Sequence, residues 1–289
     1  MYNILVTGAS GQLGSEIRAL SDNYPNYNFF FTDIEQLDIC NYESVAYFNK
    51  SNKINAIINC ASYTAVDKAE EQYEIANKIN HLAVANFAQI AKENQIKYIH
   101  VSTDYVFDGT AYKPYTEADI PNPQSVYGKT KLDGEAAVLK INPANSIIIR
   151  TSWVYSSYGN NFVKTMIRLG KERSEFNVVA DQIGTPTYAG DLAAAILTIL
   201  PQLNNSSVEL FHYSNEGICS WYDFAKAIFE LTHIAISVNP IESSQYPTPA
   251  QRPFYSVLNK NKIKESFDCK IPYWKDALIV CIQEMNSLK

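Results

Sequence analysis

The chain has 289 residues, of which 46% are hydrophobic, so it is long enough to bury one large core or two smaller ones. A formal net charge of −6 without a basic cluster argues against nucleic acid as the main partner. The longest apolar run, Leu192 to Leu200, is shorter than the roughly 20 residues of a membrane span, and no signal-peptide pattern opens the chain. We therefore expect a cytoplasmic protein with neither a nucleic-acid nor a membrane partner.

The placing of cysteines and histidines bears on whether the chain has disulfides or a metal site. The five cysteines are scattered without Cys-x-x-Cys spacing, and the four histidines form no ligand-spaced pair. These patterns predict reduced thiols and no zinc site.

The chain begins with a strand, a glycine-rich turn and a helix. An apolar run from Asn3 to Thr7 leads into Gly8-Ala9-Ser10-Gly11-Gln12-Leu13-Gly14, after which Ile17 and Leu20 continue with helical spacing. Glycines let the backbone approach a pyrophosphate, and a helix N-terminus supplies free N–H groups to hold it. The pattern predicts that a dinucleotide binds at Gly8, Gly11, Gln12, Leu13 and Gly14. An ordinary tight turn is the alternative.

A second strand, Asn28 to Thr32, ends at Asp33. This carboxylate lies about 20 residues after the glycine turn, where it can accept a hydrogen bond from the adenosine ribose and would disfavour a 2′-phosphate. A loop or cap role for Asp33 is the alternative. Asp38 and Ile39 suit the amino group and ring face of an adenine, although Asp38 or Asn41 could instead cap a helix. We predict NADPH or NADH as the cofactor.

A third buried strand, Asn55 to Cys60, precedes a run of small and hydroxyl-bearing residues. Open parallel sheets bind ligands at the carboxyl ends of their strands, so we expect cofactor contacts from this run. It consists of Ala61, Ser62, Tyr63 and Thr64. A helix is expected from Lys68 to Ile79, with Asp67 as its cap.

A long helix, about Asn77 to Glu93, leads to a fourth strand from Lys97 to Val101. Strands and helices alternate through this half of the chain. The order predicts a doubly wound α/β fold, in which helices cover both faces of a parallel sheet.

Groups suited to proton transfer follow the fourth strand. Thr103 lies at the mouth of the expected sheet, where its hydroxyl can hydrogen-bond a substrate carbonyl. Tyr127 and Lys131 are four residues apart on a predicted helix, so both lie on one face. An adjacent ammonium favours phenolate and lowers the pKa of a tyrosine from about 10. We predict catalysis by Thr103, Tyr127 and Lys131. A chance pair on a solvated helix is the alternative for the last two.

The pattern changes after Arg150 to shorter elements with more loops. Helices are expected at 161–171, 221–231 and 274–285, and a further helix that Asp191 caps is expected to run to Leu200. Strands are expected at 176–180 and 208–213, and a turn at 184–187. We predict a dinucleotide-binding domain at 1–150. Residues 151–289 are expected to serve mainly substrate capture, with some elements returning to the first domain.

Several strings together resemble the dTDP-4-dehydrorhamnose reductases, a family of extended short-chain dehydrogenase/reductases, over essentially the full length. The matching strings are residues 7–14, 63–70, 102–107, 150–155 and 159–162, and Arg252-Pro253 with Ser256 and Leu258. Related dehydratases carry glutamate directly after the Thr-Asp pair, where this chain has Tyr105. That departure favours reduction over dehydration.

The resemblance implies a function and further site residues. The implied reaction is reduction of dTDP-4-dehydro-β-L-rhamnose to dTDP-β-L-rhamnose by NAD(P)H, with Tyr127 as proton donor and Lys131 holding the nicotinamide ribose. The implied substrate contacts are Val66, Thr103, Asp104, Trp153 and Arg252. A core position is the alternative for Trp153, while an arginine is a natural partner for phosphate oxygens.

Glu16 matches a glutamate that some family members use in a magnesium-linked dimer contact. The segment after Pro186 lacks convincing acidic partners for it, so we predict no metal and a monomer or weak homodimer. Two other functions stay open: another sugar-nucleotide reductase or epimerase, and a non-catalytic regulatory subunit with this fold. The intact Thr103, Tyr127 and Lys131 set argues against the second.

Overall fold

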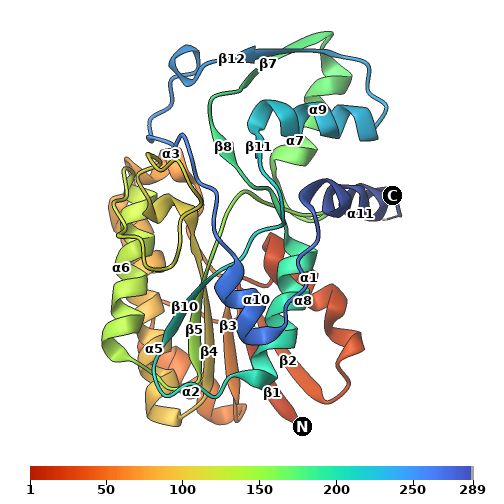
Figure 1. Ribbon diagram of the computed structural model, residues 1–289. Helices are drawn as coiled ribbons and strands as arrows, with labels where there is room; N and C mark the ends of the chain where they lie inside the picture. The colour runs from red at the N-terminus through yellow and green to blue at the C-terminus, as the bar shows by residue number, and fades with distance from the viewer. Residues whose placement is uncertain (288–289) are drawn as a thin grey trace.

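A parallel six-stranded sheet forms the centre of the molecule (Figure 1). The computed structural model describes residues 1–287, and the strand order in this sheet is β10-β5-β4-β3-β1-β2. The predicted doubly wound α/β fold is confirmed. The strands are β1 (Tyr2–Thr7), β2 (Tyr27–Thr32), β3 (Ala56–Asn59), β4 (Lys97–Thr103), β5 (Ser146–Thr151) and β10 (Glu209–His212).

Alternate side chains of the strands bury the two faces of the sheet. Ile4 and Val6 pack with α1 (Gln12–Leu20) and α8 (Ala189–Ile199) on one face. Leu5 points the other way. It joins a core with the helices of the second face, which are α2 (Tyr42–Ser51), α5 (Ala83–Asn94) and α6 (Val126–Ile141).

The second half of the chain builds a separate core beyond the carboxyl ends of the strands, at the top of Figure 1. Its helices are α7 (Phe162–Glu172), α9 (Trp221–Leu231) and α11 (Trp274–Ser287). Its strands form three short pairs: β7 (Glu175–Val179) with β12 (Ser237–Ile241), β8 (Ile183–Gly184) with β11 (Cys219–Ser220), and β6 (Val154–Tyr155) with β9 (Thr187–Tyr188).

Some elements of the second half of the chain belong to the six-stranded sheet and the helices that cover it. Strand β10 pairs with β5, helix α8 packs on α1, and Ile263 of α10 (Asn261–Phe267) joins the same core. The sheet is therefore completed by residues beyond 150. The division into a cofactor domain at 1–150 and a substrate domain at 151–289 stays a prediction about function.

The prediction of one continuous helix from Lys68 to Ile79 is wrong. It is split into α3 (Val66–Ala69) and α4 (Tyr73–Asn77), and a π-helical turn at Lys78–Leu82 then leads into α5. The fully buried Asn80 lies in this turn, where its amide bonds to Tyr63 and Thr130. Turns of this type are frequent at functional sites, because they redirect side chains that a regular helix would point elsewhere.

Asp191 does not cap α8, contrary to prediction. Tyr188 is the N-cap residue of that helix, and the Asp191 carboxylate instead accepts a hydrogen bond of 2.7 Å from Asn215 Nδ2. The contact joins α8 to a loop far along the chain. Local sequence could not reveal it.

No helix among residues 1–287 is both long and apolar enough to cross a bilayer.

A buried ion pair fastens α6 to the sheet. The Arg150 guanidinium of β5 contacts the Glu135 carboxylate of α6 at 2.6 Å and 3.0 Å, and Ser102 of β4 donates a further hydrogen bond to Glu135. Both charged side chains are almost fully buried, at 4% and 1% exposure. Removal of one partner would leave the other as an uncompensated buried charge.

We predict that Glu135→Leu lowers the free energy of unfolding by about 3–5 kcal/mol, because Arg150 loses its partner. Urea denaturation measures this loss. The double variant Glu135→Leu/Arg150→Met should recover most of it. As a control, Glu172→Ala breaks the exposed Arg168–Glu172 pair and should cost less than about 1 kcal/mol. Equal losses in the two single variants would contradict the prediction.

Candidate active site

Three of the predicted catalytic side chains meet where β4 ends and α6 begins. Ser125 caps α6 by accepting a hydrogen bond of 3.2 Å from Gly128 N, so Tyr127 lies in the first turn of the helix. The Tyr127 hydroxyl lies near the hydroxyls of Thr103 in β4 and of Ser62, which follows β3, and both lower its pKa. Lys131 lies one turn further along the same face and is 2% exposed.

The acidity of Tyr127 differs from our expectation. Burial raises its pKa to about 12, although hydrogen bonding to Thr103 and Ser62 lowers it. Lys131 is not among the groups in the described chain that shift this pKa. Its Nζ instead donates to the backbone oxygen of Val101 at 2.7 Å. The expectation that Lys131 lowers the pKa of Tyr127 is therefore wrong for the chain alone.

Lys131 itself has an unusual environment. Burial lowers its pKa to about 8, while the negative charge of Glu135 acts in the opposite direction. Its Nζ also lies 3.5 Å from His100 Nε2, and His100 is fully buried. The low pKa places the titration of Lys131 near physiological pH.

Asp104 follows Thr103 directly and is 1% exposed. Burial raises the pKa of its carboxyl to about 6. Thr103 Oγ1 donates to Asp104 Oδ1 at 3.1 Å, so the two side chains are held together. Asp104 can accept a hydrogen bond from a sugar hydroxyl while it is ionised.

The glycine turn lies where the strand order of the sheet reverses. Strand β1 has β2 on one side and β3 on the other, which makes the loops after β1 and β3 neighbours. Gly8 adopts φ +65°, and a Cβ there would lie 2.7 Å from the Cα of Ala61. Glycine is therefore required at this contact. Gly11 begins α1 without a side-chain cap, so the first N–H groups of α1 can bind an anion.

Asp33 and Asp38, two residues predicted to contact the cofactor, have different surroundings. Asp33 accepts hydrogen bonds from Ser10 N at 3.0 Å and Ser10 Oγ at 2.5 Å, so it lies directly beside the glycine turn. Asn41, not Asp38, caps α2, because Asn41 Oδ1 accepts from Ser44 N at 3.0 Å. Asp38 bonds to the nearby Cys40 N at 2.9 Å.

Other predicted cofactor residues have structural contacts of their own. The Leu13 side chain belongs to the core under α1, and Ile39 packs against the core on the opposite face. Gln12 Nε2 donates to Val154 O at 3.3 Å, and Gln12 Oε1 accepts from Asn161 Nδ2 at 3.0 Å. Gln12 thus links the glycine turn to the second half of the chain.

A cleft of about 310 Å³ opens in the second half of the chain, and Arg252 lines it. Aromatic side chains form much of its wall, namely Phe162, Phe176, Trp221 and Tyr246. Arg252 forms a two-pronged ion pair with Asp67, in which its Nη2 lies 2.8 Å from Asp67 Oδ2. Asp67 was expected to cap a helix, but Ala65 takes the cap position of α3. The Arg252 side chain lines the cleft and is 26% exposed.

The remaining predicted substrate residues lie at the same end of the sheet. Val66 begins α3 and packs in a small cluster with Tyr63, Tyr105 and Tyr127. Trp153 follows β5 and stacks on Trp221, with ring centroids 3.6 Å apart. Its partly buried ring packs against the core of the second half and lies next to Trp221, which lines the cleft, so the substrate role of Trp153 stays a prediction.

Sequence reasoning missed two residues that support the site. Glu135 holds α6 in place, and its position four residues after Lys131 was a visible signal. Asn80 holds the segment after β3 by accepting hydrogen bonds of 2.9 Å from Ser62 Oγ and Tyr63 N. Nothing in the local sequence marks Asn80, because its partners come from two other elements.

Glu16 is buried at 3% exposure, and burial raises its pKa to about 7. It accepts a hydrogen bond of 2.5 Å from Ser156 Oγ. Tyr188 lies between Glu16 and Glu284 of α11 and bonds to both carboxylates. A second carboxylate near Glu16 was not foreseen, because α11 is far from α1 in the sequence.

Comparison with known proteins agrees with this geometry. The model of the family described as "RmlD substrate binding domain" matches residues 2–287. The dTDP-4-dehydrorhamnose reductase of Aggregatibacter actinomycetemcomitans is 42% identical over 288 residues, which cover 96% of this chain and 97% of that protein. The chain belongs to the dTDP-4-dehydrorhamnose reductase family. The resemblance drawn from the sequence motifs is thus confirmed.

Solved structures of the family have the same fold over their full length. The dTDP-4-dehydrorhamnose reductase of Clostridium acetobutylicum has a TM-score of 0.93 and 47% identity, covering 98% of this chain and 99% of that one. The reductase of Bacillus anthracis, solved in complex with NADP, has a TM-score of 0.93 and 38% identity, covering 98% and 100%. The family likeness therefore includes both halves of the molecule.

Proposed function

We propose that this protein is the NAD(P)H-dependent oxidoreductase that reduces dTDP-4-dehydro-β-L-rhamnose to dTDP-β-L-rhamnose, the last step of dTDP-rhamnose synthesis. Relatives that share about two fifths of its residues over nearly their full length are named for this activity, at 42% identity. The observation that carries the proposal is the meeting of Thr103 and Tyr127 at the strand end beside the glycine turn.

The residues around the topological switch fit a dinucleotide. Gly8 permits close backbone approach, and the uncapped start of α1 suits a pyrophosphate. Asp33 and Asp38 with Ile39 would hold the adenosine, and residues 61–64 would line the cofactor's other end. When bound, the nicotinamide cofactor supplies the hydride. A relative solved with NADP supports this assignment.

Tyr127 is the proposed proton donor. Its pKa of about 12 keeps the phenol protonated throughout the physiological range, so it is always able to donate. Negative charge develops on the C4 oxygen of the sugar during reduction. Tyr127 protonates that oxygen, and the Thr103 hydroxyl stabilises it by a hydrogen bond. Lys131 holds the nicotinamide ribose hydroxyls, and Asp104 accepts a hydrogen bond from the sugar.

Arg252 and the aromatic cleft are proposed to hold the nucleotide end of the substrate. A guanidinium binds phosphate oxygens in two-pronged fashion, and aromatic faces suit a base. The chain carries a net charge of −6, so an anionic substrate needs this local cation. Asp67 now neutralises Arg252, and a diphosphate would have to share or displace that carboxylate.

The direct test is oxidation of NADPH or NADH on addition of dTDP-4-dehydro-β-L-rhamnose, followed by absorbance. Net consumption of the reduced cofactor distinguishes reduction from epimerisation, in which the cofactor is regenerated. We expect stoichiometric oxidation with formation of dTDP-β-L-rhamnose. No turnover with any 4-keto sugar nucleotide would instead favour a non-catalytic regulatory role.

We predict that Tyr127→Phe lowers kcat by at least ~10²-fold, because oriented general acid catalysis is typically worth ~10²–10⁴-fold. Cofactor affinity, measured by fluorescence titration, should change little, since the ring is kept. Tyr105→Phe is a matched control on a neighbouring, partly buried phenol, whose ring centroid lies 5.5 Å from that of Tyr127. Near-normal turnover in Tyr127→Phe would refute the assignment.

The pH dependence of kcat/KM should be bell-shaped, because this parameter reports the free enzyme. As pH falls through about 6, Asp104 gains a proton and loses its role as acceptor. As pH rises through about 8, Lys131 loses its proton and its charge. Asp104→Asn should abolish the acid limb and keep the alkaline one. A flat profile across both values would contradict the assigned roles.

We predict that Asp33→Asn raises the ratio of kcat/KM for NADPH to that for NADH by roughly 10-fold, since a nearby carboxylate repels a 2′-phosphate. The amide can still accept the hydrogen bonds from Ser10. Steady-state kinetics with each cofactor measures the ratio. Glu35→Gln removes an exposed neighbouring charge and serves as the control. An unchanged ratio in Asp33→Asn would place this carboxylate away from the ribose.

The substrate class follows from the family. The oligomeric state, a monomer or a weak homodimer, stays a prediction.

A further inference from the structure

Trp153 has a backbone conformation that needs support. Its φ is +47°, in the left-handed region that a bulky residue rarely adopts. Such outliers persist only where the surroundings hold them in place, and they gather at functional sites. One restraint is direct, because the Trp153 carbonyl accepts a hydrogen bond of 3.1 Å from Thr187 N.

A second tryptophan holds the ring of Trp153. The indoles of Trp153 and Trp221 are stacked at 3.6 Å with an interplanar angle of 10°. Phe162 packs against Trp221 with centroids 4.6 Å apart, so the outer indole is itself supported. Trp221 also lines the cleft that contains Arg252. Trp221 therefore contacts both the cleft proposed for the nucleotide and Trp153, which the family resemblance implies as a substrate contact.

The stacked pair occupies space that a side chain at Gly184 would fill. A Cβ on Gly184 would lie 2.6 Å from Cε2 of Trp153 and 2.9 Å from Ser256 Oγ. Any residue other than glycine would have to displace the indole. Close approach of the β8 backbone thus fixes the other side of the Trp153 ring.

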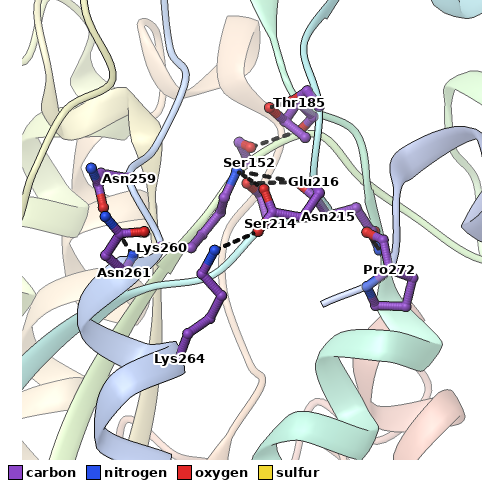
Figure 2. A network of polar contacts seen from close by, with 11 residues as sticks. Ser152, Thr185, Ser214, Asn215, Glu216, Asn259, Lys260, Asn261, Lys264 and Pro272 are labelled. Atoms are coloured by element: carbon purple, nitrogen blue, oxygen red, sulfur yellow. Dashed lines mark hydrogen bonds and ion pairs between the residues drawn. The ribbon is translucent and has the colours of Figure 1, made fainter. Parts of the chain in front are cut away.

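A chain of buried hydrogen bonds joins the segments that carry these residues. Ser152 Oγ donates to Thr185 O at 2.8 Å, and Thr185 Oγ1 donates to Gly217 O at 2.8 Å. Figure 2 shows Ser152 and Thr185 joined in this way, within a larger network that includes Asn215. Ser152 precedes Trp153, Thr185 follows Gly184, and the loop at Gly217 leads to Trp221.

We propose that Thr185 and Trp221 are positioning residues for the sugar of the substrate, acting through Trp153. The fully buried Thr185 hydroxyl ties together the segments of Trp153 and Trp221, and the stack then holds one orientation of the Trp153 ring. A nucleotide in the cleft contacts the same stack. The pair therefore couples occupancy of the nucleotide cleft to placement of the C4 carbonyl near Tyr127. The choice of substrate rests on the proposed function.

Thr185→Val, with Thr185→Ser as its control, tests the hydrogen bond from Thr185 Oγ1 to Gly217 O without removing an aromatic ring. Valine keeps the branched shape and loses the hydroxyl, whereas serine keeps the hydroxyl. We expect Thr185→Val to lower kcat for the sugar nucleotide about 10-fold, because small misplacement of a reacting group is costly. The affinity for NADPH should be unchanged. Thr185→Ser should stay near wild type.

Circular dichroism gives a readout that needs no turnover. Two closely stacked indoles produce an exciton couplet, and the chain has only three tryptophans. The couplet should vanish in Trp221→Leu and in Trp153→Phe, weaken in Thr185→Val and persist in Trp274→Phe. Trp221→Leu should also raise the KM for the sugar nucleotide roughly 3- to 10-fold through the lost aromatic contact.

Two results would overturn the proposal. One is a couplet and a kcat in Thr185→Val equal to those of the wild type and of Thr185→Ser. The other is a loss of kcat in Thr185→Val that matches the fraction of unfolded protein measured by thermal denaturation. These outcomes are distinct from failure of the proposed function. In that case the wild type would show the couplet and no turnover of the sugar nucleotide.

Discussion

The site depends on one buried ion pair, between Glu135 of α6 and Arg150 of β5. Tyr127, Lys131 and Glu135 are spaced by four residues, so they share one face of the helix. The pair clamps that face against β4 and β5, with Ser102 as a third contact. Two buried charges contribute little net stability, but their geometry is specific. The clamp aligns the phenol of Tyr127 with the hydroxyl of Thr103.

Burial then sets the chemistry of the aligned groups. A tyrosine with a pKa of about 12 stays protonated throughout the physiological range, so it is present in the form that can donate a proton. Lys131 responds to the same burial in the opposite direction, and its pKa of about 8 brings it close to neutrality. The amine bonds to the Val101 carbonyl in the chain alone. Ribose hydroxyls would offer it further partners, in line with the proposed role of Lys131 in holding the cofactor.

The two halves of the molecule meet at polar and aromatic contacts that surround this centre. Gln12 connects the glycine turn to Asn161, and Arg252 pairs with Asp67 of α3. Trp221, which stacks on Trp153, lines the cleft proposed for the nucleotide. The residues proposed for substrate binding thus include several far from β4 in sequence, whereas those proposed for the cofactor lie mainly in the loops after β1, β2 and β3.

The sequence by itself determined the first four strands of the sheet, because apolar runs of strand length alternate there with helical spacing, and it identified Tyr127 with Lys131 through a four-residue spacing. Both signals are local. The sequence did not predict β5 or the place of β10 beside it. Only the tertiary structure decided what Asp67, Asn80 and Trp153 do. Asp67 pairs with an arginine from the far end of the chain, and Asn80 and Trp153 are held by neighbours from several segments. Contacts between distant segments leave no periodic pattern, so local sequence cannot reveal them.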